Sequence, residues 1–162
     1  MKSTIAISSL LFASMLSLAD THHIETDKKV DFSTFKTFAV REGRVSSRNA
    51  EINNKLTLKA IEDSIRATLI AGGLKEAADR PNLIVSFSLA EEGQRGVVGR
   101  GIRNAQVVST SEGTLVIDMT SPAASAPVWH GIYTDDEDNA ARLAKKLPGD
   151  AKKLLSEFPP KR

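Results

Sequence analysis

Hydrophobic residues recur at helical spacing in one long segment of the chain. Residues 50–71 contain neither Gly nor Pro, which favours an uninterrupted helix. The apolar positions fall on one helical face: Ile52, Leu56, Leu58, Ile61, Ile65 and Leu69. Asn49 can cap the start of this helix, and Gly72-Gly73 supplies a left-handed stop at its end. The pattern predicts an amphipathic helix over 50–71.

Elsewhere apolar and polar residues alternate with a period of two, which is typical of a strand with one buried face. The clearest case is 83–90, where Leu, Val, Phe and Leu alternate with Ile, Ser, Ser and Ala. The segments 113–120 and 127–133 are joined by small residues, and together they predict a hairpin. Further strands are expected at two shorter segments, 36–40 and 105–110.

The end of the chain carries a second helical pattern. Its apolar residues share one face: Leu147, Ala151, Leu154, Leu155 and Phe158. Pro148 lies inside this pattern and lacks the N–H that a helix interior needs. We therefore expect two helical segments, or a kink, after residue 139. The acidic run 135–138 is predicted to be a solvated patch at the start of this region, because negative charge suits a helix N-terminus.

Two segments show neither period. Residues 20–30 are polar, and we expect them to form a loose tail. Residues 91–104 are rich in Gly and Arg, and we expect a mobile loop there. The remaining elements run in the order strand, helix, strand, a further short strand, strand, strand, helix. This order predicts a single α+β domain over 31–160, with a mainly antiparallel sheet of four to five strands and two helices packed on one face.

The first residues have the pattern of an export signal. Lys2 is followed by the apolar run Ile5 to Leu16, which has the length of a signal-peptide core and is too short to span a bilayer. Small residues precede a cleavage site after Ala19. We predict a signal peptide over 1–19 and a periplasmic or secreted mature chain. A lipoprotein would need Cys at the cleavage point, where this chain has Asp20, so no lipid anchor is expected.

Composition narrows the chemistry. The 162 residues include 22 Lys and Arg against 20 Asp and Glu, a net charge of +2 that falls by one when Lys2 is removed with the leader. With no basic helix and no aromatics interleaved with Lys or Arg, nucleic-acid binding is disfavoured. The chain has no Cys, which excludes disulfides, thiol nucleophiles and Cys-ligated metal centres. No later segment is apolar enough to cross a membrane, and no cofactor is predicted.

An ordered set of short motifs runs along most of the chain. They are Val30-Asp31-Phe32-Ser33, Phe35-Lys36-Thr37-Phe38-Ala39, the helix from Ile61 to Gly73, Pro81-Asn82-Leu83-Ile84-Val85-Ser86-Phe87, Glu112-Gly113-Thr114-Leu115-Val116-Ile117-Asp118, Val128-Trp129-His130-Gly131 and Phe158-Pro159-Pro160. In this set the chain resembles the bacterial envelope family named domain of unknown function 4136. The resemblance implies an exported α+β domain, often a lipoprotein, and transfers no catalytic residue. The missing Cys and the Pro148-Gly149 pair are departures from the family pattern.

Two candidate ligand sites follow from residue type. A mature N-terminus Asp20-Thr21-His22 would offer an amine, two amide nitrogens and an imidazole to Cu(II) or Ni(II) in square-planar geometry, with His23 as a spare ligand; the alternative is a disordered polar tail. In the second, Arg95, Arg100 and Arg103 gather without a nearby acid, so the loop can attract an anionic partner such as lipid headgroups or polysaccharide. The alternative is a flexible solvated loop.

His130 is the one histidine outside the tail and thus the one candidate for a catalytic base. Asp118, on the predicted partner strand, is its candidate orienting group, although no Ser lies in a nucleophile elbow. Trp129 and His130 alternate along a strand, so a buried Trp129 would leave His130 on the opposite face. The leading hypothesis is a non-enzymatic exported domain that binds or scaffolds an envelope partner of unknown oligomeric state. The alternatives are a small hydrolase using His130 or loop carboxylates, and metal binding by the N-terminus.

Overall fold

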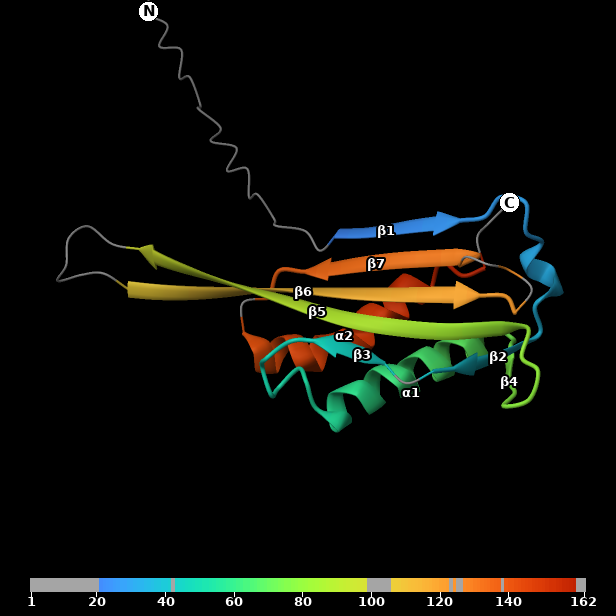
Figure 1. Cartoon of the computed structure of the whole chain (residues 1–162), viewed down its shortest axis with the longest axis horizontal. Helices are drawn as coiled ribbons and strands as arrows, with labels where there is room; N and C mark the ends of the chain where they lie inside the picture. The colour runs from blue at the N-terminus through green and yellow to red at the C-terminus, as the bar shows by residue number, and fades with distance from the viewer. Residues whose placement is uncertain are drawn as a thin grey trace, which may run out of the picture.

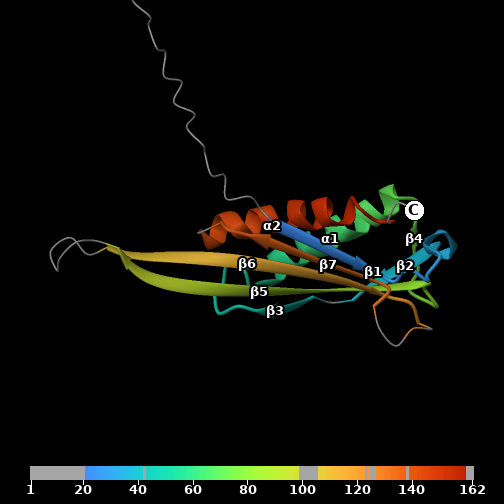
Figure 2. The same cartoon turned by 90° about the horizontal axis from the view of Figure 1, so that it is seen from above.

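The computed structural model describes residues 21–41, 43–98, 106–122, 124, 127–137 and 139–159, with only the backbone for 92–98 and 106–112. The fold is a seven-stranded mixed sheet with two helices on one face (Figures 1 and 2). The main path through the sheet runs β1-β7-β6-β5-β2-β4, and β3 pairs with β5 beside this path. The predicted α+β class and the two-helix layer are confirmed. The sheet has more strands than expected, and some pair in parallel.

One half of the sheet is antiparallel. It consists of four strands: β5 (Leu83–Val98), β6 (Gln106–Thr120), β7 (Trp129–Asp135) and β1 (Thr21–Thr26). β5, β6 and β7 pair in chain order, and β1, the first strand of the chain, pairs antiparallel with the outer edge of β7. β5 and β6 are much longer than the others, and their paired ends extend well beyond the rest of the sheet (Figure 1).

The other half pairs in parallel along β5. Its members are β2 (Thr37–Val40), β3 (Arg44–Ser46) and β4 (Lys75–Glu76). β2 lies between β5 and β4, and β3 pairs with a later part of β5, residues 88–90. Parallel neighbours need a crossover connection, and helix α1 (Lys55–Ala71) lies in the connection from β2 and β3 to their parallel partners β4 and β5. A single 3₁₀ turn, Phe32–Thr34, is capped by the Asp31 carboxylate and leads into β2.

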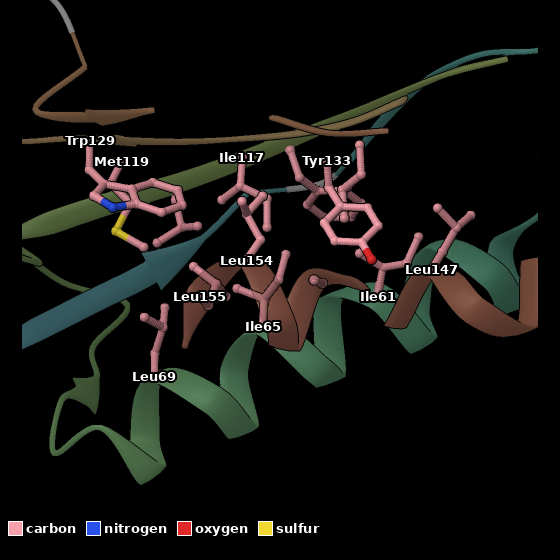
Figure 3. Packing of buried hydrophobic residues seen from close by; sticks show 14 of the residues in the cluster. Ile61, Ile65, Leu69, Ile117, Met119, Trp129, Tyr133, Leu147, Leu154 and Leu155 are labelled. Atoms are coloured by element: carbon pink, nitrogen blue, oxygen red, sulfur yellow. The ribbon is translucent and has the colours of Figure 1, made fainter. Parts of the chain in front are cut away.

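Both helices lie on the same side of the sheet (Figure 2). They are α1 (Lys55–Ala71) and α2 (Ala140–Leu155). Figure 3 shows the contact layer, in which Ile117, Met119, Trp129 and Tyr133 project from the strands toward the helices. The helices contribute Ile61, Ile65, Leu69, Leu147, Leu154 and Leu155, which are all nearly or fully buried. Burial of this one continuous layer is the main stabilising contribution to the fold.

Two predicted loops are strands instead. The loose tail expected over 20–30 is wrong for Thr21–Thr26, which pairs with β7 as the edge strand β1. The loop expected over 91–104 is strand as far as Val98, where β5 still pairs with β6. Likewise the separate strands expected at 105–110 and 113–120 form one continuous β6. In each case backbone hydrogen bonds to a neighbouring strand supply the order, and these bonds do not require apolar side chains.

Three details predicted for the helices are wrong. Asn54, not Asn49, caps α1, because its Oδ1 accepts from the Thr57 N–H at 2.9 Å. Leu56, assigned to the apolar stripe, is 82% exposed. The two segments expected at the C-terminus are a single α2 with Pro148 in its interior. The Pro148 carbonyl accepts a hydrogen bond from Ser64 Oγ of α1 at 2.5 Å, which ties the two helices together at this point.

Candidate functional site

The sheet face opposite the helices, called the open face below, carries a row of polar residues across four strands. Ser86 of β5 is the register partner of Asp118 in β6, Asp118 is the partner of His130 in β7, and His130 is the partner of Glu25 in β1. All four alternate with buried neighbours along their strands or lie on the edge, so they face away from the helices. The row is a candidate site because it gathers a base, two acids and a hydroxyl group.

His130 and Asp118 form the central pair of this row. The distance between His130 Nδ1 and Asp118 Oδ1 is 2.6 Å, and each side chain is about one-third exposed. The carboxylate therefore fixes the orientation of the imidazole, as predicted from the sequence. Trp129, the preceding residue, is fully buried on the other face, as the alternation required.

The order of the row decides which chemistry it can support. Asp118 lies between Ser86 and His130, so the Ser86 and His130 backbones are separated by two strand spacings, about 10 Å. A hydroxyl nucleophile has to reach the base directly, with the acid on the far side of the imidazole. Ser86 therefore does not complete a triad with His130 and Asp118.

Two shallow hollows flank the row. One, of about 440 Å³, is open to solvent and is lined by Glu25, Thr26, Asp27, Pro127 and His130. The other, of about 370 Å³, is lined by Arg41, Arg44, Ile84, Ser86 and Thr120. The open face therefore has acidic groups at its β1 side and two arginines at its β2–β3 side. Arg41 and Arg44 were not among the predicted site residues, because the sequence pattern predicts no strand at β3.

Two buried carboxylates lie on the other side of the sheet, where β7 meets α2. Asp135 is fully buried and Asp150 is 1% exposed. Asp135 Oδ1 accepts from the Glu137 N–H at 2.8 Å and from Lys146 Nζ at 2.6 Å, while Asp150 Oδ1 accepts from Lys153 Nζ at 3.4 Å. Burial first, and then the neighbouring charge of Asp135, raise the pKa of Asp150 to about 6.

This pair overturns the solvated acidic patch predicted at 135–138 as far as Asp135 is concerned. Asp150 occupies the apolar stripe of α2, three residues after Leu147 and four before Leu154. A carboxylate at a core position of an amphipathic helix is the sequence signal that would have identified it. Because both carboxylates are buried and each Oδ1 already accepts from a lysine, we assign the pair to the packing of α2 against β7 and not to ligand binding.

The predicted N-terminal metal site is described only in part. Asp20 lies outside the described residues, while Thr21 and His22 belong to β1. The His22 ring stacks on Tyr133 with a centroid distance of 6.5 Å, and its Nε2 lies 2.7 Å from Glu157 Oε1. Copper binding by the mature terminus would have to withdraw the imidazole from both partners. Across the described part of the chain, no three His, Asp or Glu side chains are grouped to hold a metal ion.

The predicted anion-binding arginines fall largely outside the described residues. Arg100 and Arg103 are not described, and Arg95 is placed only by its backbone, in β5 opposite Ser109. The anionic-partner hypothesis therefore stays a prediction. A third hollow, of about 560 Å³, lies between the helices and includes Leu56, Ala60, Ala141, Ala144 and Pro148 in its lining. No helix in the described part of the chain has the length and apolarity needed to span a membrane.

The layers and strand order define an α+β domain whose helices cover one sheet face and leave the other open. The family described as "Domain of unknown function (DUF4136)" matches residues 23–160, so the chain belongs to this family. The resemblance drawn from the sequence is confirmed. A search of curated proteins gives no significant match.

Several solved structures share the fold. A DUF4136 family protein from Bacteroides thetaiotaomicron is 18% identical, with a TM-score of 0.61 over 86% of this chain and 96% of the other. A PDZ domain protein from Parabacteroides distasonis has the same TM-score at 14% identity; this chain covers 36% of its length, and 87% of this chain is matched. The PelC dodecamer from Paraburkholderia phytofirmans is 13% identical, with a TM-score of 0.54 over 89% of this chain and 100% of the other. At these identities the likeness establishes the fold alone.

Proposed function

We propose that this protein is a non-enzymatic scaffold domain, exported to the bacterial envelope, that assembles with copies of itself. The observation that carries the proposal is the open face of the sheet. It presents a broad polar surface with shallow hollows, where an enzyme of this size would need a concave pocket with converging groups. A broad, shallow surface suits contact with another macromolecule.

The arrangement of the polar row supports a scaffold over the alternative hydrolase. His130 is held by Asp118, and the nearest hydroxyl in the row, Ser86, lies beyond that carboxylate. The base therefore has no nucleophile of the row within hydrogen-bond reach. Among the described residues, Asp150, whose pKa is raised, is buried under α2 and does not line any of the three hollows described above.

Export is supported by the sequence of residues 1–19, and self-assembly by the fold. PelC from Paraburkholderia phytofirmans, with the same fold, is a dodecamer. The domain architecture is therefore compatible with an extended homo-oligomer, which would place many open faces side by side. The absence of a Cys after Ala19 supports a chain that is not lipid-anchored.

Sedimentation velocity on the exported protein tests the proposal. We expect a species larger than the monomer over a wide range of concentration, and a monomer at every concentration would contradict it. N-terminal sequencing of the same material should begin at Asp20, and a sequence that begins at Met1 would contradict export. Turnover of chromogenic esters or glycosides that disappears in His130→Ala would favour the hydrolase.

A further inference from the structure

The paired ends of β5 and β6 form a two-stranded ribbon that protrudes from the domain (Figures 1 and 2). β7 stops pairing with β6 at Gly113, and β3 stops pairing with β5 at Ala90. From Glu92–Glu112 out to Val98–Gln106 the two strands pair only with each other among the described residues. Seven residue pairs at about 3.4 Å each extend the ribbon by roughly 20 Å beyond the sheet.

Among the residues that the structure describes, no third strand pairs with either outer edge of this ribbon. In a two-stranded ribbon every second N–H and C=O of each strand points away from its partner strand. Such ribbons are marginally stable in water unless a further strand or a helix supports them. The register from Glu92 to Val98 is continuous, with no skipped residue. No β-bulge therefore prevents either edge from pairing with a further strand.

The sequence of one edge lacks the protection that exposed strands usually carry. The outer part of β6, Gln106–Ser111, reads QVVSTS, with no charge, no Pro and no Lys. Half of these residues are β-branched, which favours extended backbone. Natural edge strands that remain unpaired are blunted by Lys, Pro, bulges or covering segments. A six-residue edge without charge or Pro is instead typical of a strand that pairs with another chain.

We propose that Gln106–Ser111 is the assembly strand of this protein, and that it pairs antiparallel with the same segment of a second copy. This inference rests on the self-assembly proposed above and names the surface responsible. An edge without charge offers nothing to select a charged foreign peptide, whereas two identical edges are complementary about a two-fold axis. Because the ribbon protrudes, two ribbons can overlap while the domains stay apart.

The absence of native Cys makes cross-linking the sharpest test. Val108→Cys, Ser109→Cys and Thr110→Cys each place a thiol in the centre of the edge, and each faces its own copy when the two-fold axis passes through that residue. The double variant Val108→Cys/Ser109→Cys covers full overlap of the six residues, in which residue 108 of one copy faces residue 109 of the other. Ser156→Cys, at the exposed end of α2, is the matched control. Under mild oxidation we expect a several-fold larger fraction of covalent dimer from at least one edge variant than from Ser156→Cys. Equal fractions would overturn the proposal.

A second variant separates this inference from the proposed function. Ser109→Lys adds the charge that natural edges use against pairing, and Ser156→Lys is its control. We expect Ser109→Lys to sediment as a smaller species than the unaltered protein, with an unchanged circular dichroism spectrum. If Ser109→Lys still assembles, Gln106–Ser111 is not the assembly strand, but the proposed scaffold function is not contradicted. A monomeric unaltered protein would refute the scaffold itself. A cross-link to a foreign peptide in envelope extract, without a self-dimer, would replace the second copy as partner.

Discussion

Trp129 and His130 are consecutive residues of β7 that lie on opposite faces of the sheet. The Trp129 ring is fully buried under the helices and meets Phe158 edge to face, with a centroid distance of 6.2 Å. The His130 ring is at the open face, paired with Asp118. One peptide bond thus separates a residue that stabilises the core from one that shapes the surface.

Substitution of these two residues should separate stability from surface chemistry. Trp129→Ala removes a large side chain from a fully packed layer, and we expect a loss of about 3–5 kcal/mol in the free energy of unfolding. His130→Ala removes a partly exposed hydrogen bond between His130 and Asp118, and we expect a loss below about 1 kcal/mol in the free energy of unfolding. Urea unfolding of both variants measures the difference. Similar losses would mean that the His130–Asp118 pair carries structural weight that its exposure does not indicate.

Gly131 and Gly149 should respond oppositely to replacement by Ala. A Cβ at Gly131 would lie 2.5 Å from Trp129 Cη2 and 3.0 Å from Leu154 Cγ, while one at Gly149 would have no neighbour within 4 Å. We expect Gly131→Ala to destabilise the fold by about 1–3 kcal/mol through overpacking. Gly149→Ala should stabilise it by up to about 1 kcal/mol, because Ala is favoured over Gly inside a helix. Thermal unfolding of the two variants should move in opposite directions, and a shared direction would contradict this account.

Asn82 joins the start of β2 to the start of β5. Its Oδ1 accepts from the Lys36 N–H at 3.0 Å and from the Thr37 N–H at 3.3 Å, and its own N–H donates to Thr37 Oγ1 at 2.9 Å. Asn82→Ala removes the acceptor, and we expect a loss of about 1–2 kcal/mol in unfolding free energy. Asn82→Asp keeps an acceptor at this position and is the matched control. Equal losses in both variants would show that the amide nitrogen, and not Oδ1, is the important group.

The sequence predicted those parts of the fold in which side-chain burial and element type coincide. Leu83, Val85, Phe87 and Leu89 are buried in alternation, so the period of two identified their strand. The opposite faces of Trp129 and His130 followed from the same rule. β1 was missed because its residues, Thr-His-His-Ile-Glu-Thr, are mostly polar, and it is held by backbone pairing with β7. Edge pairing depends on the partner strand, which no local pattern reports.

The central pair of the candidate site, His130 and Asp118, could be predicted from the sequence, but the residues around the pair could not. His130 and Asp118 were brought together by expecting a hairpin between their strands, which the structure confirms. The position of Ser86 beside Asp118 depends on the register between β5 and β6. The position of Arg44 depends on the parallel pairing of β3 with β5, two strands that helix α1 separates along the chain. Registers between strands are set by tertiary packing, so these neighbours could not be derived from spacing along the chain.

Asp150 should make the fold more stable in mild acid than near neutrality, relative to a variant without the carboxylate. Its pKa is raised to about 6 by burial and by Asp135, whereas an unfolded Asp titrates near pH 3.9. Between these values the folded chain holds a proton that the unfolded chain has lost. The free energy of unfolding contributed by this group therefore falls as the pH rises from about 4 to about 6. Two units of pKa correspond to roughly 3 kcal/mol, which is the order of the effect.

Asp150→Asn keeps the shape of the side chain and removes its titration. Above about pH 6 we expect Asp150→Asn to be as stable as the unaltered protein or more so, because it ends the repulsion from Asp135; near pH 4 the advantage should vanish. Urea unfolding at about pH 4.5 and about pH 7.5 gives the difference between the two proteins, which cancels the other carboxylates. Asp79→Asn, whose side chain is 92% exposed, is the control and should show no such difference. If Asp150→Asn is instead less stable at neutral pH by several kcal/mol, the ionised carboxylate is the stabilising form, and its pairing with Lys153 outweighs both the burial and the charge of Asp135.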